Sequence, residues 1–164
     1  MDIRDSGECE NANSKGSLMD HVQTQMLNRI VTILTGLTTT GSRVFRSREH
    51  PLTLATVPGL CISLGSEGNI GGTLDGTTKS VKLNIGIVVA GDDDVLSSRS
   101  LAEIEAALYG DFSAGRFFSG LAENLIYSGS DSKYVTSTAL KHTRKDVVYK
   151  VEYQTQDGNA YAAC

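Results

Sequence analysis

The stretch Val81-Lys82-Leu83-Asn84-Ile85-Gly86-Ile87-Val88-Val89 decides the fold of this chain. Apolar residues occupy every second position from 81 to 89, which places one continuous aliphatic stripe on one face of a strand. The other face carries Lys82, Asn84 and Gly86. At about 3.3 Å per residue, the stretch spans roughly 30 Å and crosses a small domain. We therefore predict a central strand whose apolar face is covered by helices.

An amphipathic helix precedes this strand in the sequence. Apolar residues recur at steps of three and four after residue 21, which predicts a helix over about residues 18–36 that ends at Gly36. Ser17 with Asp20, and Asp20 with Gln23, have the spacing of a capping box. The apolar stripe of this helix is the predicted cover of the central strand.

Further helical segments follow the central strand. Ser100 and Glu103 have capping-box spacing, and apolar residues follow at helical steps up to Gly110, which predicts a helix over about residues 98–109. A short helix over residues 121–126 is also predicted. The first of these segments, residues 98–109, is the second main helix of the helical layer.

Two more segments have the pattern of strands. Residues 57–65 place Leu60, Ile62 and Leu64 on one face, and residues 141–155 alternate as a long last strand. The predicted fold class is α+β, a mostly antiparallel sheet of about four strands with two main helices packed on one face.

The length of 164 residues predicts one domain with tails. We expect a flexible N-terminal arm over residues 1–16, a single α+β domain over 17–156 and a flexible C-terminal tail over 157–164. The alternative for the arm is that it orders against a neighbouring subunit. No stretch approaches the roughly 20 apolar residues of a spanning helix, and residues 1–16 have no signal-peptide core. We therefore expect that the chain does not associate with a membrane.

The segment Ser66–Lys79 is rich in glycine and joins two predicted strands as a long hairpin tip. It contains no Gly-Lys-Ser/Thr, and it leads into a strand instead of a helix N-terminus, so phosphate binding is disfavoured. Loops of this length in compact domains are functional or disordered. We predict a flexible contact loop with four candidate contact residues, namely Glu67, Asn69, Asp75 and Lys79.

Neither a metal site nor catalysis is predicted. Three dispersed cysteines without a C-x-x-C spacing argue against a disulfide framework and a zinc site and are typical of a reducing compartment. The histidines are equally scattered and are expected to face solvent: His21, His50 and His142. Glu103 and Glu105 point to different sides of their helix, and no G-x-S-x-G elbow occurs. We expect no enzyme activity and no cofactor.

Two basic clusters and one acidic run remain. The basic clusters are Arg43, Arg46 and Arg48 with His50, and residues 141–145. Each is either a solvated face or a subunit interface, where arginine suits carboxylate pairing. The acidic run Asp92, Asp93 and Asp94 either pairs with such a cluster in a neighbouring subunit, lines a channel, or leads into the second helix.

The order of these parts resembles the tail terminator (minor tail protein) family of long-tailed bacteriophages over roughly residues 18–155. The resemblance rests on the following parts in order: the N-terminal helix, Gly41-Ser42-Arg43-Val44-Phe45, Arg48, Pro51-Leu52, Val57-Pro58-Gly59-Leu60-Cys61-Ile62, the hairpin, the acidic turn, a helix, and Val148-Tyr149-Lys150-Val151-Glu152-Tyr153.

The resemblance implies an α+β subunit of a homohexameric ring that caps the head-proximal end of the tail tube, stops tube polymerisation and joins the head connector. It implies three protein partners, namely further copies of this chain, the major tail tube protein and the connector or neck protein, with DNA only as cargo in the channel. The location implied is the virion, assembled in the bacterial host cytoplasm. The alternatives are another neck or head–tail completion protein, an unrelated RNA- or ligand-binding α+β module, and an enzyme of unseen mechanism.

Overall fold

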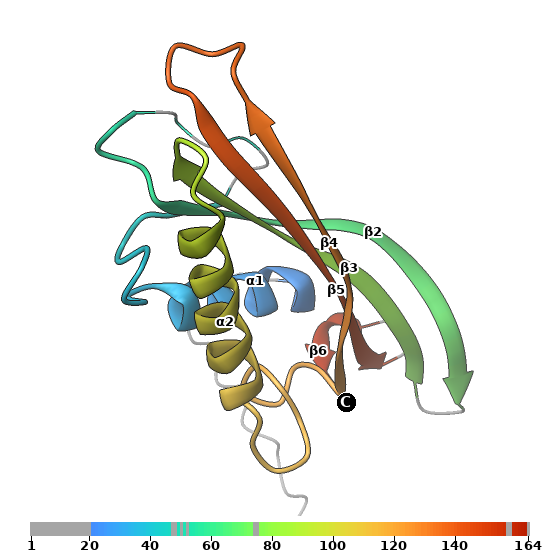
Figure 1. Cartoon of the computed structure of the whole chain (residues 1–164). Coiled ribbons are helices and arrows are strands. Elements are labelled where there is room, and N and C mark those ends of the chain that lie inside the picture. The colour runs from blue at the N-terminus through green and yellow to red at the C-terminus, as the bar shows by residue number, and fades with distance from the viewer. Residues whose placement is uncertain are drawn as a thin grey trace, which may run out of the picture.

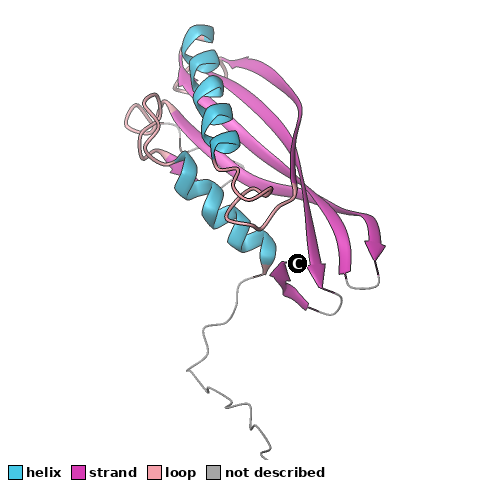
Figure 2. Cartoon of the chain, turned by 90° about the horizontal axis from the view of Figure 1, so that it is seen from below, coloured by secondary structure: helices cyan, strands magenta, loops and turns pink. Residues whose placement is uncertain are grey.

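The computed structural model describes residues 21–46, 49, 51, 53–73, 76–156 and 159–163, which form two layers (Figure 1). These residues make one six-stranded sheet with two helices on one of its faces (Figure 2). The elements in chain order are α1 (Val22–Leu34), β1 (Val44–Phe45), β2 (Gly59–Thr73), β3 (Gly76–Ala90), α2 (Asp94–Gly110), β4 (Asn124–Val135), β5 (His142–Gln156) and β6 (Asn159–Ala163). The α+β class predicted from the sequence is confirmed.

Strand β3 lies at the centre of the sheet. The strand order is β1-β2-β3-β5-β4, and β6 pairs with the end of β5. Only the short pair β1 and β2 is parallel among the described strands; the other pairs are antiparallel. The five alternating residues of the apolar stripe are at most 1% exposed: Val81, Leu83, Ile85, Ile87 and Val89. The predicted central strand with a covered face is therefore confirmed.

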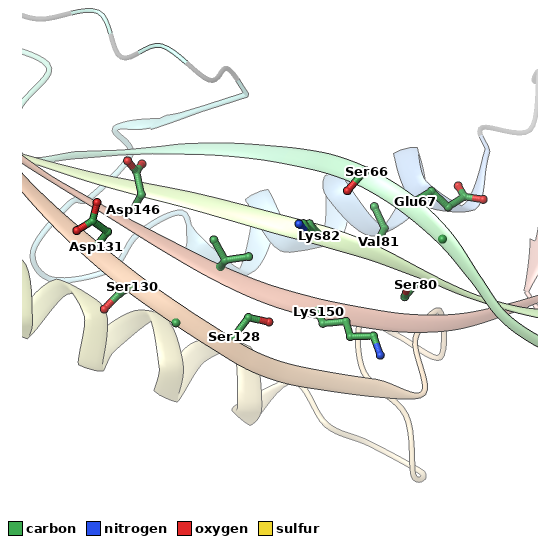
Figure 3. Close-up of a pocket in the computed structure, with 13 residues that line it drawn as sticks. Ser66, Glu67, Ser80, Val81, Lys82, Ser128, Ser130, Asp131, Asp146 and Lys150 are labelled. Atoms are coloured by element: carbon green, nitrogen blue, oxygen red, sulfur yellow. The ribbon is translucent and has the colours of Figure 1, made fainter.

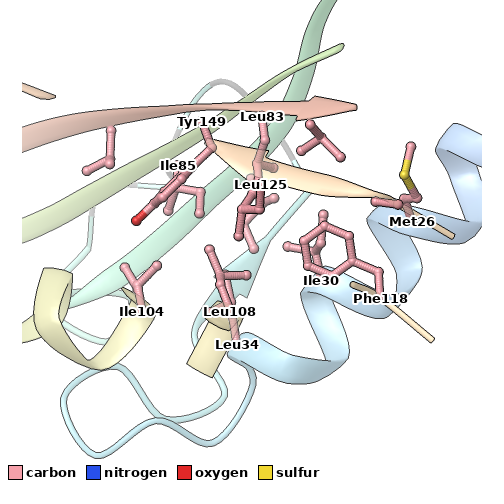
Figure 4. Packing of buried hydrophobic residues seen from close by; sticks show 14 of the residues in the cluster. Met26, Ile30, Leu34, Leu83, Ile85, Ile104, Leu108, Phe118, Leu125 and Tyr149 are labelled. Atoms are coloured by element: carbon pink, nitrogen blue, oxygen red, sulfur yellow. The ribbon is translucent and has the colours of Figure 1, made fainter. Parts of the chain in front are cut away.

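The helices and the covered face of the sheet share one core (Figure 4). Helix α1 contributes Met26, Ile30 and Leu34, and α2 contributes Ile104 and Leu108, all fully buried. Complete burial of a side chain of this size stabilises the fold by roughly 1.5–3 kcal/mol. Among the described residues, no helix is both long and apolar enough to cross a membrane.

The prediction of a flexible loop over residues 66–79 is wrong. Strand β2 continues to Thr73 and β3 begins at Gly76, so the two strands pair almost to their tip. Register shifts after Leu64 and after Asn69 interrupt the ladder. This segment is held by backbone pairing, which glycine allows, and it has no apolar stripe. The alternation of apolar and polar residues that reveals a half-buried strand is therefore missing from its sequence.

Residues 121–126 do not form the predicted short helix, because β4 begins at Asn124 and pairs with β5. Leu125 is buried and Ile126 is exposed, which is the alternation of a strand with one covered face. A short apolar run does not distinguish a helix from a strand. Residues 159–163, predicted as part of a flexible tail, form β6, while the predicted domain boundaries stay a prediction.

The structure describes the N-cap of each helix. In α1 the N-cap is His21, whose Nδ1 accepts a hydrogen bond from the backbone N–H of Gln23 at 3.2 Å. Residues 17–20 lie outside the described residues, so their capping box stays a prediction. Helix α2 begins at Asp94, four residues before the predicted start, because the side chain of Asp93 accepts from the N–H of Leu96 at 2.8 Å.

Candidate interaction surface

The face of the sheet opposite the helices carries two adjoining hollows. The larger, about 630 Å³, extends across β3 and β5 between β2 and β4 (Figure 3). The smaller, about 420 Å³, lies over β2, β3 and β5. Ser66, Lys82 and Asp146 line both hollows, so the two form one continuous concavity. We call this uncovered side of the sheet, with Lys82, Asp131, Arg144, Asp146 and Lys150, the bare face.

Charged side chains on the bare face form rows whose sign alternates along the strands. The register places like charges directly beside each other in neighbouring strands: Lys133 beside Arg144, Asp131 beside Asp146, and Lys82 beside Lys150, with Glu152 two residues further along β5. Like charges opposite each other across a ladder are unfavourable. The pattern therefore does not serve the stability of the isolated sheet through cross-strand pairing.

Ion pairs run along the strands instead. Arg144 Nε lies 2.8 Å from Asp146 Oδ1, and Lys150 Nζ lies 2.6 Å from Glu152 Oε1. A Cβ atom at Gly86 would meet Arg144 Nη2 at 3.0 Å and Asp146 Oδ1 at 3.2 Å. Glycine at this position therefore lets the Arg144–Asp146 pair lie close against β3, and a larger residue would displace the pair.

The thiol beside this ion pair is not activated. Cys61 of β2 is 2% exposed, and it lines the smaller hollow together with Gly86. Burial raises the pKa of Cys61 to about 11, an effect that the nearby charge of Arg144 only partly offsets. The thiol is therefore protonated at neutral pH and unreactive as a nucleophile. The described residues also contain no group of three or more His, Cys, Asp or Glu side chains placed to hold a metal ion.

Strand β4 forms one edge of the sheet and carries large apolar side chains in exposed positions. Ile126 and Tyr127 are each 44% exposed, and Tyr134 is 48% exposed. Within the described residues no strand pairs with the outer side of β4. An exposed edge of this length and character is a template for pairing with another chain.

Strand β2 provides a second open edge on the opposite side of the sheet. Strand β1 pairs only with Leu60 and Cys61. The rest of β2, residues 62–73, has a neighbour on one side alone among the described strands. The sheet therefore presents two different edges, and each has backbone groups available to a partner.

The structure describes two residues of the predicted basic cluster, Arg43 and Arg46. Arg43 Nε donates to the carbonyl of Pro58 at 2.6 Å, and its Nη2 donates to the carbonyl of Thr39 at 3.4 Å, so this side chain ties its own loop to the residue before β2. Arg46 is exposed, and Arg48 lies outside the described residues. A contact role for Arg46 and Arg48 stays a prediction.

The acidic run divides between two roles. Asp93 caps α2, whereas Asp92 and Asp94 are exposed at the start of the helix. The alternative of a turn that leads into the second helix is therefore confirmed for Asp93. A channel or interface role for the other two carboxylates stays a prediction.

The structure describes two of the three histidines that were predicted to face solvent, and for one of these two, His142, the prediction is wrong. His142 is 5% exposed, and its Nδ1 lies 2.9 Å from the carbonyl oxygen of Leu140, because β5 begins there and the loop before it folds over the ring. His21 is partly buried at the start of α1, and His50 lies outside the described residues.

The predicted hairpin contacts are only partly brought together. Glu67 Oε1 forms an ion pair with Lys79 Nζ at 3.0 Å. Asn69 is exposed and lies opposite Lys79 in the ladder, and Asp75 lies outside the described residues. Sequence reasoning missed the bare face, although the alternation of charges from Arg144 to Glu152 in β5 is a readable signal for it.

No protein-family model and no curated protein matches this sequence. Among solved structures, the fold is similar to a chain of the structure described as "Virion of native gene transfer agent (GTA) particle". The TM-score is 0.51 and the sequence identity 18%, and the match covers 84% of this chain and 95% of that chain. Similarity at this level of identity shows a shared fold.

Proposed function

We propose that this chain is a structural protein of a phage-like particle and, more narrowly, its tail terminator. In this role a ring of six copies sits on the head-proximal end of the tail tube, stops its growth and offers a joining surface to the head connector. The observation that carries the proposal is the similarity to a chain of a gene transfer agent virion, over nearly the whole length of both chains. The order of sequence features that resembles tail terminators supports the narrower role.

The proposed action is binding without chemistry. The bare face offers charged side chains already paired along their strands, including Arg144 with Asp146 and Lys150 with Glu152. The one described thiol, Cys61, is buried, and its pKa is raised. These groups suit contacts with other proteins, and with DNA as passing cargo, better than they suit proton transfer or nucleophilic attack.

The two open edges supply a geometric route to a ring. The apolar edge of β4 and the glycine-rich edge of β2 are different surfaces on opposite sides of one sheet. A contact between unlike surfaces of identical subunits is heterologous, and it closes into a ring when the rotation per subunit divides a full turn. We propose that lateral contacts between subunits use these edges and that the bare face then turns toward the ring channel.

The test is the position and symmetry of the chain in its own particle. Particles that carry an N-terminal affinity tag on this chain are labelled with gold and imaged by electron microscopy, and the free protein is imaged separately for rings. Label at the junction of tail tube and head, together with six-fold rings, supports the terminator. Label elsewhere in the neck favours another head–tail completion protein, and label along the tube shaft contradicts the proposal.

Removal of this chain from the particle tests whether it stops tube growth. Particles produced without this chain are expected to have overlong tails that lack heads, because nothing stops tube growth. Tails of normal length that fail to join heads would instead favour another completion protein. Tails of normal length joined to heads at the usual rate would contradict both roles.

A further inference from the structure

One carboxylate connects four elements of the fold where β2 leaves the body of the sheet. Glu67 lies at the register shift that follows Leu64 in β2. Its Oε1 lies 3.0 Å from Lys79 Nζ of β3, and its Oε2 accepts a hydrogen bond from the hydroxyl of Tyr153 in β5 at 3.0 Å. The side-chain amide of Gln23, at the start of α1, donates to the same oxygen. The carboxylate therefore joins α1, β2, β3 and β5.

The cluster is closed on itself and partly shielded from water. Gln23 Nε2 also donates to the hydroxyl of Tyr153 at 2.9 Å. Tyr153 is fully buried, and the side chains of Glu67 and Lys79 are 34% and 26% exposed. Charge-assisted hydrogen bonds in such surroundings are stronger than those on an open surface.

The protonation states fit this arrangement. Burial raises the pKa of Glu67, but hydrogen bonds from Lys79 and Tyr153 and the charges of Lys79 and His21 outweigh it, and the pKa lies below its ordinary value. Burial raises the pKa of Tyr153 to about 12. At neutral pH the carboxylate is therefore charged and the phenol remains a donor.

The β3 arm of this part of the sheet pairs with β5, from Thr77 opposite Thr155 to Ser80 opposite Glu152, whereas the β2 arm has β3 as its one neighbour among the described strands. We call residues 67–73 and 76–80 the distal hairpin. Its β2 arm has glycine at positions 68, 71 and 72, and Ile70, the one large apolar residue of this arm, is 49% exposed. The ladder joins β2 to β3, but register shifts after Leu64 and Asn69 interrupt it. Such irregularities bend and twist a strand, so pairing with β3 leaves the direction of β2 incompletely fixed.

We propose that Glu67 is a positioning residue that clamps the β2 arm of the distal hairpin to α1 and β5 and so fixes the direction of this arm beyond the register shift. We take the end of the tail tube as the docking partner of this hairpin, which then meets it in its bound direction and loses less conformational entropy on contact. The role in docking rests on the proposed function, whereas the clamp itself concerns the isolated chain.

The clamp is tested by a distance measurement between two spin labels. The labels are placed by Ile70→Cys in the distal hairpin and Arg99→Cys on α2, both exposed positions. Cys9 and Cys164 are replaced by Ser, and Cys61 is buried and remains unlabelled. Double electron–electron resonance is expected to give a narrow distance distribution in this background and a clearly broadened one with Glu67→Ala. An unchanged width in Glu67→Ala would overturn the clamp.

Two further variants separate positioning from simple stability. Asp131→Asn is the matched control, because Asp131 is 72% exposed and lies 3.8 Å from Lys133 within one strand, so its loss is expected to leave the width unchanged. Tyr153→Phe removes one donor to the carboxylate and keeps the ring, and a partial broadening is expected.

Amide hydrogen exchange completes the test. Exchange in the β2 arm of the distal hairpin, residues 67–73, is expected to be roughly tenfold faster in Glu67→Ala, the loss expected for hydrogen bonds to a charged group. Exchange in α2 and central β3 is expected to be unchanged. A uniform increase over the whole chain would show a general loss of stability and would overturn the positioning role.

The docking role is read separately in particles. With Glu67→Ala in the particle, gold-labelled chain is expected to occupy fewer tube ends than the parent does. If Glu67→Ala broadens the distance distribution but the occupancy of tube ends stays normal, the clamp is supported and its role in docking is overturned. If the parent chain is absent from tube ends, the proposed function fails, and the distance measurement still decides the clamp.

Discussion

The two faces of the sheet differ in what holds them and in what they offer a partner. The covered face is a continuous apolar surface in which Ile85 and Ile87 of β3 share one core with residues of both helices. The bare face of the same strand carries Lys82 beside Lys150 of β5, in rows of alternating charge. The covered face explains why the chain folds. The bare face, with the open edges beside it, is the surface that remains for assembly.

The largest expected effect separates the two faces within one strand. Replacing Ile85 by Asp places a charge without a partner in the core and is expected to cost several kcal/mol, enough to prevent folding of a domain of ordinary stability. Lys82→Asp, three residues away on the bare face, is expected to stay folded, because the new carboxylate lies beside Lys150.

Circular dichroism melting of both variants checks this pair. Loss of the cooperative transition in Ile85→Asp, with a melting temperature near that of the parent in Lys82→Asp, is the expected result. Equal destabilisation by both substitutions would break the distinction between the faces.

The second prediction concerns the apolar edge. Ile126→Lys and Tyr134→Lys place charges on β4, which we propose as part of a lateral contact, and they are expected to abolish rings while the monomer stays folded. Val95→Lys is the matched control, since Val95 is an exposed apolar residue of α2 at 72%. Ring counts by negative-stain microscopy and the melting temperature are the two readouts. Rings of normal number in both β4 variants would remove this edge from the interface.

The third prediction concerns the acidic run before α2. Asp93→Ala removes the cap that accepts from Leu96 N–H and is expected to cost about 1 kcal/mol in the free energy of unfolding. Asp92→Ala is the control, because Asp92 is exposed and its loss is expected to change stability much less. Urea unfolding measures both. Equal losses from the two substitutions would contradict the assignment of the cap.

The smallest expected effect is a dependence of stability on acid pH. Hydrogen bonds from Lys150 and Asn124 lower the pKa of Glu152, and those from Lys79 and Tyr153 outweigh burial to lower that of Glu67. Because the folded-state pKa values lie below those of the unfolded chain, both carboxylates stabilise the fold above the ordinary glutamate pKa of about 4.3. This contribution is lost as the pH falls through the folded-state values.

Urea unfolding between about pH 6 and about pH 3 measures this loss. Glu67→Gln is expected to reduce the fall in stability over that interval, because a residue that does not titrate replaces one that does. An unreduced fall in Glu67→Gln would show that Glu67 contributes nothing to the acid dependence.

The apolar alternation of β3 and β5 made the covered face predictable, because burial of one face leaves a period of two in the sequence. Val81 to Val89 and Val147 to Tyr153 both lie where this pattern predicts. The distal hairpin was not predictable in the same way, since glycines and exposed residues pair through their backbones and leave no period. Strand β4 was not predicted: Leu125 and Ile126 at its start are adjacent apolar residues of which only Leu125 is buried, and the rest of the strand is rich in exposed residues.

The candidate site was harder to predict because it depends on which strands lie side by side. Arg144, Asp146 and Lys150 alternate within one segment, but Lys82 and Asp131 reach the same surface from other parts of the chain. The clamp at Glu67 similarly needs Gln23 and Tyr153, which are 44 and 86 residues away in the sequence. Spacing along the chain does not reveal such neighbours, whereas strand register does.

The most direct test of the central claim is a reconstruction of the particle's head–tail junction by electron cryomicroscopy. We predict one ring of six copies of this chain at the head-proximal end of the tail tube, with the bare face turned to the channel and β4 in the lateral contact between subunits. Copies of this chain repeated along the tube, or its absence from the junction, would contradict the account.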